Sequence, residues 1–258
     1  MKLDGALALV TGASSGIGEA TARALAIRGS KVILLARSKP RLDTIVADIR
    51  SRAGEADAYD VDLADPGAIA TCIRNLVSEH GTPDILVNNA GAGRWLPIAE
   101  TSAEEAAQMM AVPYLAAFNI TRELLGGMRK RGSGHIVNVT SVATQLAWPG
   151  AVAYTAARRA VGGFNAALRA DLYGSAVGVT LAMFGTVDSP YWQHNPGSRE
   201  RLPKRAAAIR PLAPDDAAAA IVASIESGKR VIVKPPIFRL FFLLNTRFPV
   251  QTEALMCS

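Results

Sequence analysis

The sequence predicts one α/β domain over residues 1–258, built on a doubly wound parallel β-sheet with helices on both faces. Short apolar runs recur along the chain, and segments with helical character separate them. Continuous apolar runs are typical of parallel strands that are buried on both faces. The expected strands are Ala6–Val10, Lys31–Leu35, Ile85–Val87, His135–Val139, Gly178–Ala182 and Arg230–Val233. Helices are expected at Ile17–Arg28 and from Pro214 to near Gly228.

The composition is compatible with a large buried core and leaves two interpretations of the charge. Hydrophobic side chains make up 50% of the 258 residues and charged side chains 19%. The formal net charge of +6 fits a nucleic-acid or membrane surface, or a soluble enzyme that binds an anionic cofactor. No basic cluster with interleaved aromatic residues occurs, so we expect no nucleic-acid partner.

The cysteine content and the first ten residues bear on the cellular compartment of the protein. Cys72 and Cys257 are too few and too far apart for a disulfide framework or a metal site. We therefore expect a reducing, cytoplasmic compartment and no bound metal. Met1–Val10 reads as a first strand rather than as a signal peptide. No apolar stretch reaches the roughly 18 residues that a spanning helix needs.

A glycine-rich segment, Thr11–Gly18, follows the first expected strand and precedes the first expected helix. Glycines at such a turn let backbone N–H groups approach a pyrophosphate at the positive end of the helix. The segment reads TGxxxGxG rather than GxGxxG. We interpret it as a dinucleotide-binding turn of a Rossmann-type fold, although such turns also serve helix–strand packing alone.

The end of the second expected strand bears on which dinucleotide is bound. An acidic residue there would accept hydrogen bonds from the adenosine ribose and repel a 2′-phosphate. This chain has Ala36 followed by Arg37. A guanidinium can bind a phosphate through paired, charge-assisted hydrogen bonds. Arg37 therefore favours NADP(H) over NAD(H), against the alternative of a solvated surface arginine.

Three motifs together resemble the short-chain dehydrogenase/reductase family along nearly the whole chain. They are the TGxxxGxG turn, the segment Asn88–Gly91, and Ser141 followed thirteen residues later by Tyr154. The resemblance implies hydride transfer between a nicotinamide and a carbonyl or secondary alcohol, in a homodimer or homotetramer. By the same resemblance, the implied cofactor contacts are Gly12, Ser14, Ser15, Gly16, Ile17, Gly18, Asp62, Leu63, Asn89, Ala90, Gly91, Tyr154, Arg158, Val187 and Ser189. Asn88 is expected to be a structural amide that bonds to neighbouring strands.

The family's acid–base group corresponds to Tyr154, and Ser141 corresponds to the hydroxyl that holds the substrate oxygen. The family has a lysine four residues after the tyrosine, one helical turn along the same face. This chain has Arg158 there, while Arg159 is rotated well off that face. Arg158 keeps the positive charge that stabilises a phenolate, but it cannot release a proton at ordinary pH.

Two further departures from the family pattern lie outside this pair. The family's helix, expected here at Met109–Leu125, has an asparagine that anchors a relay water, and the corresponding residue is Pro113. Proline has neither a polar side chain nor an N–H, so we expect that anchor to be missing. Phe184 stands where the family usually has proline, a milder change that leaves Val187 and Ser189 able to hold a carboxamide.

Two segments are expected on the substrate side. Residues 188–212 are polar and rich in Pro, Gly and Arg, and correspond to the family's variable lid. Residues 235–258 form an apolar tail around Ile237–Leu244. The tail could pack over the substrate cleft or a partner subunit, or it could contact a membrane surface or a lipophilic substrate.

Two functions follow from these residues. The favoured one is an NADP-dependent oxidoreductase acting on a hydrophobic carbonyl or alcohol. The alternative is a dinucleotide-binding protein with little or no turnover, a sensor or structural subunit, which Arg158 and Pro113 would explain. The sequence leaves the substrate and the direction of the reaction open.

Overall fold

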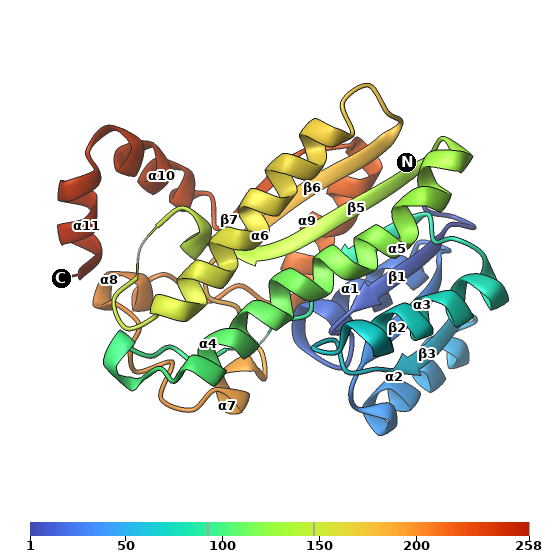
Figure 1. Cartoon of the computed structure of the whole chain (residues 1–258), viewed down its shortest axis with the longest axis horizontal. Helices are drawn as coiled ribbons and strands as arrows, with labels where there is room; N and C mark the ends of the chain where they lie inside the picture. The colour runs from blue at the N-terminus through green and yellow to red at the C-terminus, as the bar shows by residue number, and fades with distance from the viewer. Residues whose placement is uncertain (92, 147, 258) are drawn as a thin grey trace.

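The computed structural model describes residues 1–91, 93–146 and 148–257. Its centre is a seven-stranded, wholly parallel sheet in the order β3-β2-β1-β4-β5-β6-β7 (Figure 1). The strands are β1 (Leu7–Thr11), β2 (Lys31–Ala36), β3 (Ala56–Asp60), β4 (Ile85–Asn88), β5 (Gly134–Ser141), β6 (Val177–Phe184) and β7 (Val231–Lys234). The order reverses between β1 and β4, which is where doubly wound sheets bind ligands.

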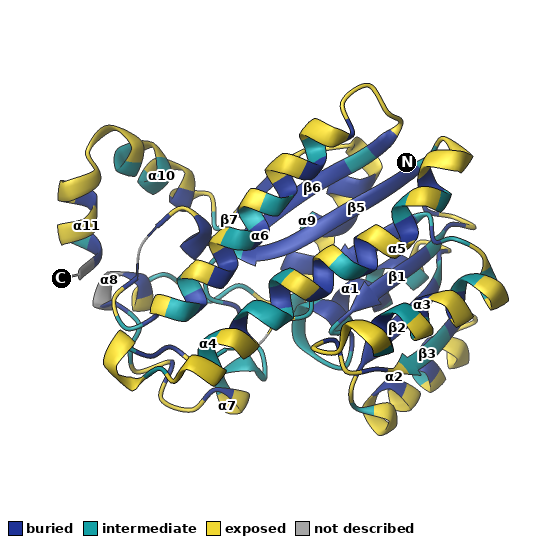
Figure 2. Ribbon diagram, in the orientation of Figure 1, coloured by how far each residue is buried: buried dark blue, intermediate teal, exposed yellow. Residues whose placement is uncertain are grey.

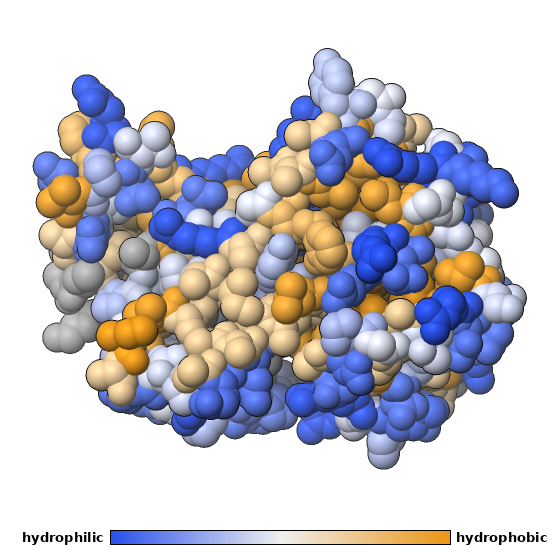
Figure 3. Space-filling view, viewed as in Figure 1, coloured by the Kyte–Doolittle hydropathy of each residue, from blue (hydrophilic) through white to orange (hydrophobic). Residues whose placement is uncertain are grey.

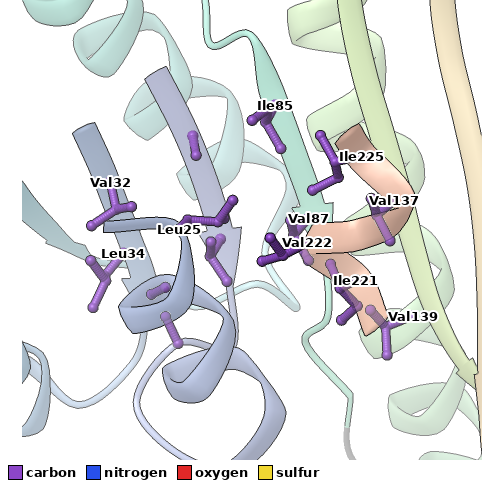
Figure 4. Packing of buried hydrophobic residues seen from close by; sticks show 14 of the residues in the cluster. Leu25, Val32, Leu34, Ile85, Val87, Val137, Val139, Ile221, Val222 and Ile225 are labelled. Atoms are coloured by element: carbon purple, nitrogen blue, oxygen red, sulfur yellow. The ribbon is translucent and has the colours of Figure 1, made fainter. Parts of the chain in front are cut away.

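Helices cover both faces of the sheet. One layer contains α1 (Gly16–Ile27), α2 (Lys39–Ser51) and α9 (Pro214–Ser227), and the other contains α3 (Pro66–His80), α5 (Ala116–Arg131) and α6 (Val152–Asp171) (Figure 1). Leu25, Ile221 and Ile225 are fully buried in the first layer, against Val87 and Val137 of the sheet (Figure 4). Figure 2 shows the resulting pattern, in which the central strands are buried and the helices that flank them are exposed on their outer sides.

Local chemistry sets the ends of several helices. The carboxylate of Asp65 accepts hydrogen bonds from the N–H groups of Gly67 (2.7 Å) and Ala68 (3.1 Å) at the start of α3. Such a cap is worth about 1 kcal/mol. α9 begins at Pro214 with an acidic first turn and ends at Gly228, whose φ of +67° suits glycine. The helix expected from Pro214 to near Gly228 is therefore confirmed.

The strand β3 was not predicted, and one predicted helix is wrong. β3 reads Ala-Asp-Ala-Tyr-Asp and lies at the sheet edge with half-exposed side chains, so it lacks the apolar run of the central strands. The helix expected at Met109–Leu125 is instead α4 (Ala103–Met110), a π-helical turn η2 (Ala111–Leu115) and α5. Val112 has φ −132° and ψ 102° there, because Pro113 disfavours the helical region for the residue before it.

The remaining elements lie at the carboxyl edge of the sheet. Short helices η1 (Ile98–Glu100) and η3 (Val142–Thr144) follow β4 and β5, and α7 (Tyr191–His194) and α8 (Lys204–Ala207) lie in the segment 188–212. A bridge between Val187 and Leu212 closes the base of that segment.

The C-terminal residues form two helices, α10 (Ile237–Arg247) and α11 (Pro249–Cys257), which lie at one end of the molecule (Figure 1). Phe238 is only 3% exposed and packs with Phe241 and Phe242 in the cluster beside the cleft. The start of the tail thus packs beside the cleft, which is one of the positions expected for it. No helix in the described ranges is long and apolar enough to cross a bilayer. The side chain of Cys257 lies outside the described residues, and Cys72 is a free thiol.

A buried histidine makes the stability of this sheet depend on pH. His135 of β5 is 4% exposed, and its Nε2 lies 2.8 Å from the Thr180 hydroxyl. That hydroxyl donates to the Lys229 carbonyl at 2.6 Å, so Nε2 must be the donor to Thr180. Burial, together with the positive N-terminus, lowers the pKa of His135 from 6.5 to about 4.

We expect this histidine to destabilise the fold in mild acid. Between pH 6.5 and about 4, the unfolded chain binds a proton at His135 that the folded chain does not. The free energy of unfolding should therefore fall as the pH drops through this window, by about 3 kcal/mol in total from this residue. Urea denaturation of wild type and His135→Gln across the window measures the contribution. The exposed His194→Gln is the control, and equal pH slopes for wild type and His135→Gln would contradict the assignment.

Candidate functional site

A cleft of about 960 Å³ runs along the carboxyl ends of the strands, across the β1–β4 reversal. It contains almost every residue that the sequence proposed for the site. Those lining it are Gly12, Ser14, Ser15, Gly16, Ile17, Arg37, Asp62, Leu63, Asn89, Ala90, Gly91, Ser141, Tyr154, Arg158, Val187 and Ser189. Gly18 is the exception, because it lies beneath the turn rather than at its surface.

The glycine turn depends on the absence of side chains at two points. A Cβ on Gly12 would lie 2.8 Å from the Cα of Ala90, and the φ of Gly12 is +63°. A Cβ on Gly18 would lie 2.3 Å from the carbonyl oxygen of Gly12. Gly18 thus permits the turn to pack closely on α1, while Gly16 and Ile17 bring the N-terminus of that helix to the cleft. This arrangement suits a bound phosphate.

Asn89 and Thr11 join the ends of β1 and β4. The Asn89 side-chain amide donates to the carbonyl of Thr11 at 3.0 Å, and the Thr11 hydroxyl accepts from the N–H groups of Asn89 (2.9 Å) and Ala90 (3.0 Å). The same hydroxyl donates to the Val87 carbonyl. The amide of Asn89 is therefore occupied in holding the glycine turn, a role that the sequence did not indicate.

Asn88 is structural, as the sequence suggested. Its amide nitrogen donates to Asn138 Oδ1 on the neighbouring strand β5 at 2.9 Å and to the hydroxyl of Thr121 at 3.2 Å. The side chain of Asn138 then donates to Asn165 of α6 at 3.0 Å. These buried amides connect the central strands to α5 and α6.

One end of the cleft is cationic. Arg37 follows β2, and Arg41, in the first turn of α2, lies beside it together with Ser38. Among the described residues neither guanidinium forms an ion pair, and both are exposed. Ser38 and Arg41 were not singled out from the sequence, although the four-residue spacing of the two arginines is visible there.

The opposite end contains the expected reactive groups. Ser141 ends β5, and its hydroxyl accepts from the N–H of Ala143 at 3.2 Å. Tyr154 lies in the first turn of α6 and is 8% exposed. Arg158 follows one turn later, with its guanidinium carbon 4.9 Å from the centroid of the Tyr154 ring. A cation at this distance from an aromatic ring is attracted by the ring's electrons.

Arg158 is held in a narrow space. It is 7% exposed, and a Cβ on Gly91 would lie 2.6 Å from one of its terminal nitrogens. Its backbone carbonyl accepts hydrogen bonds from the hydroxyls of Thr140 and Thr144, both at 3.2 Å. Its Nε is buried without a hydrogen-bond partner in the described part of the chain. The charge therefore stays beside Tyr154 because packing and the lack of a side chain on Gly91 leave it there.

Pro113 is buried within the π-helical turn that separates α4 from α5. Its neighbour Val112 lines the cleft, so the break in the helix faces the site. The expectation that a water anchor is missing at this position stays a prediction.

Aromatic residues that the sequence did not single out line the same end of the cleft. Trp95, Trp148, Tyr191, Trp192 and Phe238 all line it. The Tyr191 hydroxyl donates to the carbonyl of Gly93 at 2.5 Å, and burial beside Tyr154 raises the pKa of Tyr191 well above 10. Tyr191 therefore stays protonated at ordinary pH. In the sequence, the only sign of this aromatic lining is that tryptophans occur beside a segment rich in Pro and Gly.

No group of three or more His, Cys, Asp or Glu side chains that could hold a metal ion occurs in the described ranges. The polar side chains that line the cleft are mostly hydroxyls, amides and guanidinium groups, together with the carboxylate of Asp62 and the imidazole of His194. The site is therefore suited to an organic anion at one end and an uncharged polar group at the other.

Comparison with known proteins agrees with this geometry. The family model of the short chain dehydrogenases matches residues 6–199. The chain is 33% identical over 248 residues to the "Probable oxidoreductase EphD" of Mycobacterium tuberculosis, covering 91% of this chain and 42% of that protein. The chain thus spans about half the length, or less, of the first curated relatives that it matches. It belongs to the short-chain dehydrogenase/reductase family.

Solved structures share the whole fold. A short-chain dehydrogenase/reductase from Burkholderia phymatum in complex with NAD superposes with a TM-score of 0.88, at 25% identity over 96% of this chain and 95% of that one. A metagenomic short-chain oxidoreductase in complex with NADP gives 0.75, at 31% identity over 90% and 96%. A nicotinamide dinucleotide is therefore the cofactor class, and these relatives differ in which dinucleotide they hold.

We expect Gly91→Ala to act through Arg158. The new methyl group would displace the guanidinium at a cost of about 1–3 kcal/mol, and the slimmer ammonium of Arg158→Lys should escape most of that cost. NADPH affinity and ketone reduction, measured on wild type, both single variants and the double variant, test this coupling. Gly126→Ala is the control, since a Cβ there meets nothing within 4 Å. Equal losses from Gly91→Ala with Arg or with Lys at 158 would show that the methyl group acts elsewhere.

Proposed function

We propose that this protein is an NADP(H)-dependent oxidoreductase that interconverts a hydrophobic carbonyl compound and its secondary alcohol. The supporting observation is that Ser141, Tyr154 and Arg158 meet at one end of a cleft whose other part contains the glycine turn. The nicotinamide, when bound, supplies or accepts the hydride. The chain's own residues bind the substrate oxygen and move one proton.

In the reducing direction, the Tyr154 hydroxyl donates its proton to the oxygen of the substrate carbonyl, and the Ser141 hydroxyl holds the same oxygen. Reduction consumes one hydride and one proton and leaves Tyr154 as a phenolate. Arg158 stabilises that phenolate through its positive charge 4.9 Å from the ring centroid. Because Arg158 does not release a proton itself, Tyr154 is reprotonated by another route, most simply by solvent in the cleft.

Tyr154→Phe should abolish reduction and leave NADPH affinity almost unchanged, because only the phenol proton is lost. An NADPH-oxidation screen over aldehydes, ketones and quinones, with cofactor titrations of both proteins, measures this. Turnover that persists in the variant would mean that the acid lies elsewhere.

The same screen separates the alternative function, a dinucleotide-binding protein with little turnover. Two observations favour that alternative: the arginine in place of lysine at 158 and the buried Pro113 in the broken helix. If wild type binds NADPH but reduces nothing in the screen, the alternative is correct.

The proposed choice of NADP(H) is supported by the exposed cations at the end of β2. Arg37 and Arg41 have no acidic partner among the described residues, and the last residue of β2 is Ala36 rather than an acid. A 2′-phosphate beside them would gain charge-assisted hydrogen bonds, whereas a bare ribose would not.

Arg37→Ala should weaken NADPH binding by about 1–3 kcal/mol and leave NADH binding nearly unchanged. Fluorescence titration with both cofactors is the measurement. Arg52→Ala, an exposed arginine at the far end of α2, is the control. Equal affinities of wild type for NADPH and NADH would refute the preference.

We also propose a homodimer or homotetramer. An apolar surface lies over α5 and α6 (Figure 3), where Leu115 is 42% exposed, Phe118 41% and Val152 46%. Phe118 contacts Tyr114 and Phe164 at centroid distances of 6.5 and 5.9 Å. A second copy that covered this surface would remove it from water.

Light scattering should give a mass of twice or four times one chain, and Phe118→Glu should reduce it because a buried, unpaired charge is costly. The control is Tyr173→Glu at a residue that is 93% exposed. A monomeric wild type would contradict the proposal.

Peripheral membrane contact through the tail is a further proposal. The outer side of α10 has Ile237, Leu240 and Leu243 at 44%, 50% and 66% exposure, with Arg239 and Arg247 nearby. This combination suits an anionic lipid surface.

A further inference from the structure

The substrate end of the cleft is enclosed by six aromatic side chains, which we call the aromatic box. They are Trp95, Trp148, Tyr154, Tyr191, Trp192 and Phe238. The box includes all three tryptophans of the sequence. Its members come from five segments that are distant in sequence: the segment after β4, the segment after η3, α6, α7 and α10. Only the fold brings them together.

Trp95 is the centre of the box. Its ring centroid lies 5.5 Å from that of Tyr154, 5.8 Å from Trp148 and 6.2 Å from Trp192. All three pairs are tilted, with interplanar angles between 41° and 58°. Tilted pairs at these distances are favourable contacts between ring edges and faces. The reactive phenol of the proposed function is thus itself one wall of the box.

The other rings pack around Trp95 and Tyr154, and two of them, Tyr191 and Trp192, are also held by hydrogen bonds. Tyr191 lies 6.4 Å from Tyr154 and 5.2 Å from Trp192, and Trp148 lies 6.4 Å from Phe238. The indole N–H of Trp192 donates to the Val187 carbonyl at 3.0 Å, and the Tyr191 hydroxyl donates to Gly93. Rings fixed in this way lose little freedom when a ligand packs against the faces that line the cleft.

Charge is distributed unevenly along the cleft. The described charged residues that line it away from the box are Arg37, Arg41 and Asp62. At the box, Arg158 lies against the ring of Tyr154, the side chains Gln108 and Asn195 are neutral amides, and the exposed imidazole of His194 also lines the cleft. An anionic substrate tail would find no permanently charged partner among these described groups, apart from the cation already beside the phenol.

We propose that the aromatic box binds a flat, uncharged aromatic ring system whose ketone or aldehyde group is presented to Tyr154. This inference rests on the proposed function and narrows its substrate class. An alkyl chain would gain from burial alone, whereas an aromatic ring also gains from ring contacts. Each such contact is worth about two- to tenfold in affinity beyond the area buried.

The test compares 2-acetonaphthone with 2-dodecanone, two methyl ketones with the same number of carbon atoms. Binding is measured by calorimetry on Tyr154→Phe with NADP⁺ bound, which keeps the ring of residue 154 and prevents turnover. We expect 2-acetonaphthone to bind at least about tenfold more tightly. In wild type with NADPH, the same preference should appear in kcat/KM.

Trp192→Leu keeps an apolar side chain and removes one ring, so the ratio of aryl to alkyl affinity should fall by about two- to tenfold. Phe238→Leu should lower it independently, in case one variant does not fold. Phe248→Leu is the control, because Phe248 is 48% exposed and does not line the cleft. Its ratio should equal that of wild type.

The outcomes separate this inference from the proposed function. If 2-dodecanone binds as tightly as 2-acetonaphthone, or if removing rings leaves the ratio unchanged, the aromatic-substrate inference is wrong, whether or not ketones are reduced. If 2-acetonaphthone binds preferentially but wild type reduces neither ketone, the oxidoreductase proposal fails for these ketones and the ligand class stands.

Discussion

The cleft depends on the hydrogen bonds between Thr11 and Asn89, because they join the ends of the two strands between which the sheet order reverses. A turn of glycines has little stability of its own, since glycine loses much conformational freedom on folding. Here the amide of Asn89 bonds to the carbonyl of Thr11, and the Thr11 hydroxyl accepts two backbone N–H groups from the β4 side. The glycine turn is thereby fixed at the helix N-terminus, where a phosphate can bind.

At the other end of the cleft, a positive charge is held beside a phenol. The chain does this with a guanidinium that is larger and flatter than an ammonium. Gly91 leaves the space, and Thr140 and Thr144 hold the backbone of α6 at the residue that bears the charge. A guanidinium keeps its charge at ordinary pH, so in the proposed function Arg158 acts on Tyr154 through its charge and not by proton transfer.

The aromatic box and the C-terminal helices show how the variable part of the chain completes the site. The segment 188–212 is closed at its base by the bridge between Val187 and Leu212, and it brings Tyr191 against Tyr154 and Trp192 against Trp95. α10 then adds Phe238 from the far end of the chain. These contacts bury large rings, which stabilises the segment 188–212 and shapes this end of the cleft at the same time.

The sequence by itself determined the parallel sheet and the glycine turn, because continuous apolar runs and motif spacing are local properties, and its resemblance to the family singled out Ser141, Tyr154 and Arg158. It did not reveal β3, whose half-exposed edge position removes the apolar pattern, nor the break of the helix at Val112. Only the tertiary structure decided that Gly91 accommodates Arg158, that Asn89 holds the turn, and that the three tryptophans share one cleft. These are contacts between residues far apart in the chain, and their partners are set by how the layers pack rather than by any local pattern.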